Sequence, residues 1–375
     1  MSHSHILQAA LNHIPITLQC LRDYEITAQD FVRSDIWQYI QQGSDQNISV
    51  AANRRAFDDY GLRPRILRDV HHGGVAVQIL NETWQVPIAL APVAYHGLVH
   101  PEAELATVRA AVAMQTPMVV STLSSCRFQD IRLAAEAGAQ ELKRPVPPLW
   151  LQLYSQASQQ QTQQVLQDAL DAQFSAVMWT VDAHYKRSSL ALPEGVSAVN
   201  IDADAQYKHT SHLLDEQLVF GSWFTEHAPT WDDLAWLREQ THLPLWLKGV
   251  SHPEDAKMAL EYGIDGLVVS NHGGRVLDGM AASLHVLPEI KAATGAAVPI
   301  LLDGGIRHGT DIVKALALGA DAVMIGRPQM HALAVAGMLG VAHILHLLRM
   351  ELELALAQMG CAQIKEIHSE CLVRW

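Results

Sequence analysis

The stretch PILLDGGIRHGTDIVKALALGADAVMIGRP, residues 299 to 328, decides the fold class. It starts with an apolar run of strand length that begins at a proline and ends in the glycine-rich DGGIR. GTDIVKALALGA follows with apolar residues at helical spacing, and AVMIGRP is a second run of strand length. A strand, a helix and a further strand in this order predict two parallel strands joined by a crossover helix.

The same pattern recurs through most of the chain. Eight apolar runs of strand length start at Pro87, Pro117, Pro148, Ala176, Pro244, Gly266, Pro299 and Ala322. Their starts are spaced roughly 22 to 33 residues apart, except for a gap of roughly 68 residues between the fourth and the fifth, as expected for strand and helix pairs. Because eight parallel strands close a barrel, the sequence predicts an α/β fold of the (β/α)8 TIM-barrel type.

The rest of the chain is expected to elaborate one barrel domain that spans residues 1–375. Residues 1–75 form an N-terminal helical segment, and VAVQILNETWQVPI, which follows, predicts a hairpin that closes the barrel floor. Residues 182–243 form a long loop between the fourth and fifth strands. This loop lies at the face where barrel enzymes bind substrates, so it is a candidate lid.

Composition excludes several classes of protein. With 49% hydrophobic and 17% charged residues, the chain is too apolar for disorder. A net charge of −13 does not suit a protein that binds nucleic acid. Cys20, Cys126, Cys361 and Cys371 are far apart without a CxxC spacing, so we expect neither a metal site nor a disulfide framework. These features favour a cytoplasmic protein.

No membrane partner is expected. MSHSHILQAALNH at the N-terminus lacks the basic and apolar regions of a secretory signal. The apolar run 332–348 contains two histidines and is shorter than a membrane span, which predicts a buried helix.

Polar side chains follow the predicted strands at their C-terminal ends, where barrels place their active sites. The clearest group follows the last two strands, because DGGIR and IGRP suit a phosphate bound by backbone amides, a helix N-terminus and arginines. The residues of this predicted phosphate site are Gly304, Gly305, Arg307, Gly326 and Arg327. The simpler alternative is that these glycines only turn the chain.

A second group predicts acid–base chemistry. His272 and Arg275 stand three residues apart in SNHGGR, where a histidine base beside an arginine would suit proton removal from a small organic acid. Asp182, after the fourth strand, is placed to hold the imidazolium, and Lys248 is placed to stabilise negative charge on a ligand. The structural alternatives are a packing role for His272 and a solvent-directed Lys248.

The motifs together resemble a known family, the FMN-dependent (S)-2-hydroxy-acid oxidases and dehydrogenases, which includes glycolate oxidase, lactate oxidase, mandelate dehydrogenase and hydroxymandelate oxidase. The resemblance covers about residues 24–367. The motifs that carry it are NRRAFDDYGLRPRIL at 53–67, APVAYHGLVHPEAELA at 91–106, STLSS at 121–125, WLQLY at 150–154, LPLWLKGV at 243–250, SNHGGRVLDG at 270–279 and DGGIRHGTDIVKALALGADAVMIGRP at 303–328.

The resemblance implies roles for individual residues. It implies that His272 is the base, Asp182 its partner, Arg275 the clamp on the substrate carboxylate, and Tyr154 and Tyr39 substrate ligands. It places Lys248 beside flavin N1, where reduction builds negative charge. The implied FMN contacts are Ala94, Ser121, Gln152, Thr180, Lys248 and Ser270, with Asp303, Gly304, Gly305, Arg307, Gly326 and Arg327 at the ribityl and phosphate end.

The chain departs from the family pattern at the substrate end. Asp182 is followed by AHYKRSS where the family usually has Pro-x-x-Gly-x-Arg, so the arginine is shifted, with Arg187 as a substitute, or lost. Val276 replaces a glutamine. Tyr95 and Leu123 are expected to flank the flavin on the substrate side.

The local strings APVAY and TLSS are more similar to hydroxymandelate oxidase than to glycolate oxidase. We therefore expect oxidation of an aromatic or bulky, mandelate-like (S)-2-hydroxy acid, with lactate as the alternative, to the 2-oxo acid. Oxygen is favoured as the acceptor over a membrane quinone, and a homotetramer is expected. Other hypotheses are an FMN-binding barrel with altered or non-redox chemistry, such as an isomerase, and a non-catalytic FMN-binding paralogue.

Overall fold

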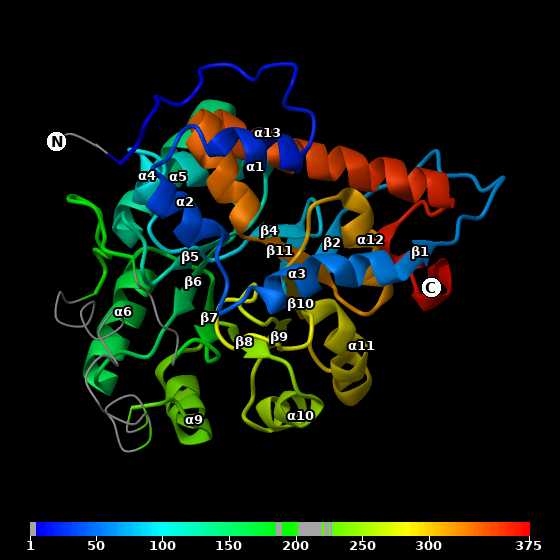
Figure 1. The fold of residues 1–375 in the computed structure, drawn as a ribbon. Coiled ribbons are helices and arrows are strands. Elements are labelled where there is room, and N and C mark those ends of the chain that lie inside the picture. The colour runs from blue at the N-terminus through cyan, green and yellow to red at the C-terminus, as the bar shows by residue number, and fades with distance from the viewer. Residues whose placement is uncertain (1–4, 185–189, 202–219, 221–224, 226) are drawn as a thin grey trace.

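A computed structural model describes residues 5–184, 190–201, 220, 225 and 227–375. Its centre is a closed parallel barrel with the strand order β10-β11-β4-β5-β6-β7-β8-β9, which confirms the predicted TIM barrel (Figure 1). The strands are β4 (Ile88–Leu90), β5 (Met118–Ser121), β6 (Leu149–Leu153), β7 (Ala176–Thr180), β8 (Leu245–Val250), β9 (Gly266–Val269), β10 (Ile300–Asp303) and β11 (Ala322–Ile325). Each strand begins within one residue of its predicted start.

Helices follow the strands and cover the barrel. They are α4 (Ala103–Met114), α5 (Phe128–Leu142), α6 (Gln159–Asp171), α9 (Trp231–Gln240), α10 (Pro253–Glu261), α11 (Ser283–Thr294), α12 (Gly309–Ala317) and α13 (Arg327–Met359). The N-terminal segment contains α1 (Leu21–Ala28), α2 (Ser34–Gln41) and α3 (Ile48–Arg55), and α1 packs along α13. A two-stranded sheet joins β1 (Tyr60–Leu62) to β12 (Leu372–Arg374) near the C-terminus.

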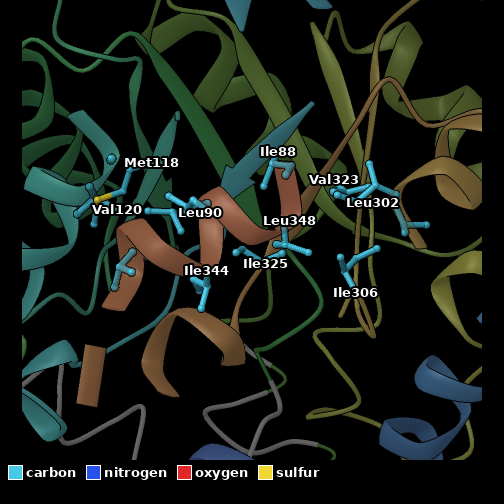
Figure 2. Close-up of a cluster of buried hydrophobic side chains, with 14 of the residues drawn as sticks. Ile88, Leu90, Met118, Val120, Leu302, Ile306, Val323, Ile325, Ile344 and Leu348 are labelled. Carbon is cyan, nitrogen blue, oxygen red and sulfur yellow. The ribbon is translucent and has the colours of Figure 1, made fainter. Parts of the chain in front are cut away.

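Alternation along the strands divides the core into two parts. Four strand side chains face outward and pack against helices: Ile88, Leu90, Val323 and Ile325. Figure 2 shows them together with Ile344 and Leu348 of α13. The intervening residues face the barrel interior. Because side chains alternate along a strand, one short strand serves both parts of the core.

The barrel floor is filled by indoles. The predicted hairpin forms from β2 (Val77–Ile79) and β3 (Glu82–Trp84). Its Trp84 lies 5.4 Å from Trp150 in ring centroids, and Trp150 lies 5.0 Å from Trp246. Three fully buried rings therefore close the end of the barrel opposite the predicted site.

Two elements refine the sequence-based picture. The C-terminal part of the predicted 182–243 loop is the barrel helix α9, which begins at a capping box of Thr230 and Asp233 and buries Leu234 and Leu237. The predicted buried helix at 332–348 lies within α13, which is kinked at Ala336 and Gly337. By length and composition alone α13 could span a membrane, and 67% of its most apolar window is buried inside the structure.

Candidate active site

A cavity opens at the C-terminal ends of the barrel strands. It encloses about 1060 Å³, including the part open to solvent. Its lining contains the predicted residues Tyr39, Ala94, Ser121, Leu123, Tyr154, Lys248, His272, Arg275, Asp303, Gly304, Gly305, Arg307, Gly326 and Arg327. Side chains that are up to 288 residues apart in sequence, from Tyr39 to Arg327, therefore meet in one place.

The predicted base is paired as expected. His272 Nδ1 lies 2.9 Å from Asp182 Oδ1, and both side chains are largely buried. Burial alone would raise the pKa of Asp182, but the charges of His272 and Lys248 outweigh it and hold that pKa below its ordinary value. Asp182 is therefore a carboxylate at neutral pH, and it accepts a hydrogen bond from the N–H at His272 Nδ1.

Room for Asp182 comes from a β-bulge. The register of β8 shifts between Lys248 and Val250, and Gly249 between them has φ +108°. A Cβ at Gly249 would lie 2.5 Å from Asp182 Cβ. Gly249 thus supplies both an unusual backbone angle and the close approach that the carboxylate requires.

Lys248 is buried beneath the cavity and held by oxygen atoms. Its Nζ lies 3.0 Å from Ser270 Oγ and 3.4 Å from Asp303 Oδ2. Burial lowers the pKa of Lys248, but Asp303 and Asp182 more than compensate, so the net pKa is raised. The Lys248 ammonium group is therefore a positive charge in the wall of the cavity.

Arg275 is placed differently from a simple clamp. Its Nη1 donates to the carbonyls of Tyr39 (2.9 Å), Ile40 (3.2 Å) and Gln42 (2.8 Å), and its guanidinium lies 4.9 Å from the Tyr39 ring centroid. The group lines the cavity while holding the end of α2. Its position is therefore set by the N-terminal segment, which strand-end reasoning did not foresee.

The predicted phosphate end collects positive charge. Arg327 starts α13 and donates to the carbonyls of Ile40 and Gly273 at 3.0 Å each. Burial lowers the pKa of Arg327, and the neighbouring charges of Arg275 and Arg307 lower it further, to about 9. An anion near this helix N-terminus would relieve the repulsion among the three guanidinium groups.

Sequence reasoning missed the support beneath the glycine loop. Arg54 donates to the Gly305 carbonyl at 2.7 Å and pairs with buried Asp311 at 2.9 Å. Asp311 also accepts the backbone N–H groups of Arg307 and His308 at the start of α12. Arg54 lies in NRRAFDDY, within one of the motifs that carry the family resemblance, and that motif is the signal that points to it.

Buried polar atoms at the strand ends provide a test for the implied cofactor. Gln152 Nε2, Thr180 Oγ1 and Asp303 Oδ1 are buried without a hydrogen-bond partner among the described residues. Unsatisfied groups of this kind are costly unless a ligand meets them. An amide donor, a hydroxyl and a carboxylate match the carbonyl, N–H and ribityl hydroxyl groups of FMN, so these residues fit the cofactor.

The remaining predicted residues lie behind the cavity wall or outside the described residues. Gln152 Oε1 accepts from Ser121 Oγ of the cavity lining (3.0 Å), and Ser270 Oγ accepts from Lys248 Nζ of the same lining. Tyr95 is buried with φ +57° and does not line the cavity, although its backbone N–H bonds to the Leu123 carbonyl at 3.0 Å. Arg187 lies outside the described residues.

The barrel, the His272–Asp182 pair and the cluster of guanidinium groups fit an α/β-barrel flavoenzyme, and comparisons with known proteins identify the family. The family described as FMN-dependent dehydrogenase matches residues 28–374. An L-lactate oxidase of Alicycliphilus denitrificans is 44% identical, covering 93% of this chain and 95% of its own. A 4-hydroxymandelate oxidase of Amycolatopsis orientalis is 39% identical, covering 93% and 96%.

A solved structure gives the same result in three dimensions. The crystal structure of mandelate oxidase with (S)-2-phenylpropionate has a TM-score of 0.83 and 35% identity, covering 95% of this chain and 98% of its own. The chain therefore belongs to the FMN-dependent dehydrogenase family and is an FMN-dependent 2-hydroxy-acid oxidoreductase that acts on CH–OH donors.

Proposed function

We propose that this enzyme oxidises aromatic or bulky, mandelate-like (S)-2-hydroxy acids to 2-oxo acids with oxygen as the acceptor. The observation that carries the proposal is the pair of His272 and Asp182. It faces a cavity that Arg275, Tyr39 and Tyr154 line. Similarity to mandelate oxidase over nearly the whole chain supports the choice of substrate. The 44% identity to an L-lactate oxidase favours lactate as the second candidate.

The substrate carboxylate would bind near Arg275 and Tyr39. Arg275 Nη1 is held on three carbonyls, so the guanidinium is already oriented and loses little freedom when it binds an anion. Tyr154 also lines the cavity, and burial, followed by the charges of Asp182 and Tyr39, raises its pKa. Its hydroxyl is therefore protonated at neutral pH, as a donor to substrate must be.

Proton removal is assigned to His272. Because Nδ1 donates to Asp182, the ring nitrogen Nε2 is the basic atom that accepts the substrate proton. Asp182 then stabilises the imidazolium. When bound, FMN would supply the oxidant, which takes two electrons and the other proton from the 2-hydroxy acid and is reoxidised by oxygen to give hydrogen peroxide. Lys248 would hold positive charge beside it.

Anaerobic mixing with (S)-mandelate, 4-hydroxymandelate, lactate and glycolate tests the proposal. Bleaching of the flavin, with the highest kcat/KM for a mandelate, is the expected result. A preference for lactate would replace the substrate assignment, and no bleaching by any acid would favour altered chemistry or a non-catalytic paralogue. Reoxidation by air at a rate that supports turnover tests oxygen as the acceptor.

A matched pair of variants tests the base. His272→Ala is expected to keep FMN and lose bleaching. His285→Ala removes another histidine paired with an aspartate, because His285 Nε2 lies 2.6 Å from Asp59 Oδ2 away from the cavity. Full activity in the first variant would place the base elsewhere. The cytoplasmic location and the homotetramer stay predictions. Light scattering of the purified enzyme tests the number of subunits.

A further inference from the structure

The loop that carries His272 has an unusual backbone. His272, Gly273 and Gly274 have φ values of +56°, +64° and +76°, so three successive residues are left-handed. Glycine accepts this conformation readily, but histidine does so at an energetic cost. Surrounding contacts must therefore hold the base in this conformation.

Asn271, directly before the base, supplies one of these contacts, beside the Arg327 bond to the Gly273 carbonyl and the His272 N–H bond to Ser270 Oγ. Its Oδ1 accepts from the Gly274 N–H at 3.1 Å and from Asn53 Nδ2 at 2.7 Å. Its Nδ2 donates to Asn53 Oδ1 at 2.9 Å and to the Ala281 carbonyl at 3.1 Å. The full hydrogen-bonding capacity of the amide is thus used, and half of it goes to Asn53.

Asn53 belongs to α3 in the N-terminal segment, 218 residues away in sequence. It is 3% exposed, and its Oδ1 also accepts from the Ser283 N–H at 3.4 Å. A Cβ at Gly305 would lie 2.2 Å from the Asn53 carbonyl oxygen. Asn53 is therefore wedged between the loop of the base and the glycine loop of the phosphate end.

We infer that Asn53 is a positioning residue for the base: through the reciprocal amide pair with Asn271 it holds the 272–274 loop so that His272 faces Asp182. The N-terminal segment thereby becomes part of the acid–base machinery. The inference rests on the proposed role of His272. It does not require Asn53 to touch substrate or FMN.

The variants Asn53→Ala, Asn271→Ala and the double variant test this inference. Asn53→Ala is expected to lower kcat/KM roughly 10- to 100-fold, as for a reacting group displaced by a fraction of an ångström. The acid limb of the kcat/KM profile is expected to move to lower pH, because a displaced imidazolium loses the stabilisation of Asp182. The double variant should lose no more than the more damaging single variant.

Two further measurements separate positioning from other roles. The ring nitrogen NMR signals of His272, assigned by their loss in His272→Ala, should change in Asn53→Ala, and this readout needs no turnover. Tyr24→Phe is the matched control, since Tyr24 belongs to the same N-terminal segment and the change removes its partly buried hydrogen bond to His343 of α13 (2.9 Å). It should lower stability without moving the profile or the signals.

Three results would overturn the inference. The losses in kcat/KM of the two single variants could add up in the double variant. Asn53→Ala could leave the pH profile and the His272 signals unchanged, or its loss of FMN affinity could account for all of its lost activity. If wild-type enzyme bleaches with no acid, the proposed function fails instead, and the His272 signals still decide whether Asn53 positions the ring.

Discussion

Replacement of Asp182 by asparagine is the sharpest test of the acid–base pair. The change keeps the size of the side chain and an oxygen that can accept from His272 Nδ1. It removes the negative charge that stabilises the imidazolium after proton transfer. The pair is well shielded, with side chains only 14% and 9% exposed, so solvent screens it little.

The size of the effect follows from the geometry. Asp182 Oδ1 lies 2.9 Å from His272 Nδ1. Two unit charges about 4 Å apart attract by about 4 kcal/mol at an effective dielectric constant of about 20. Since about 1.4 kcal/mol corresponds to a factor of ten in rate, Asp182→Asn is expected to slow substrate-dependent flavin reduction about 1000-fold.

Stopped-flow absorbance under anaerobic conditions measures this rate directly. Asp59→Asn, which removes the charge from the exposed pair with His285, is the control and should reduce at the wild-type rate. If the folded, FMN-loaded Asp182→Asn enzyme loses less than about tenfold, the charge does not support the base and the proposed pairing is refuted.

Three further changes test other parts of the structure. Lys248→Met should lower the flavin reduction potential measured by redox titration. It also leaves Asp303 without its partner, which should lower the free energy of unfolding in urea by about 3–5 kcal/mol. An unchanged potential would show that Lys248 does not lie beside the flavin. Gly249→Ala should displace Asp182, with a cost of about 1–3 kcal/mol and at least about tenfold in kcat, and wild-type values in both assays would contradict the close contact. Burial lowers the pKa values of His96 and His331, so the unfolded chain binds more protons and unfolding should become easier below about pH 6.5, by up to about 1.4 kcal/mol per pH unit for each histidine. Denaturation curves from pH 7.5 to 5 check this, and His331→Gln should reduce the slope.

The barrel could be predicted from sequence because its signals are local. Eight apolar runs of strand length, most of them after a proline or a glycine-rich turn, marked the strands. The alternation of Ile88 to Leu90 between outer and inner core follows from strand geometry. The strand-end rule also located most of the cavity wall, because parallel strands bring their C-terminal ends together. It missed α9, whose start depends on a cap within a long insertion.

The sequence by itself determined the fold class, the cavity and the residue types for proton transfer and anion binding, since each rests on short local patterns: apolar runs, helical spacing and polar residues directly after a strand. Only the tertiary structure decided that Arg275 holds the end of α2 and that Asn53 pairs with Asn271. These contacts join residues more than 200 positions apart, and their hydrogen bonds depend on side-chain orientation at atomic distance. No local pattern carries that information, so it emerges only when the N-terminal segment packs on the barrel.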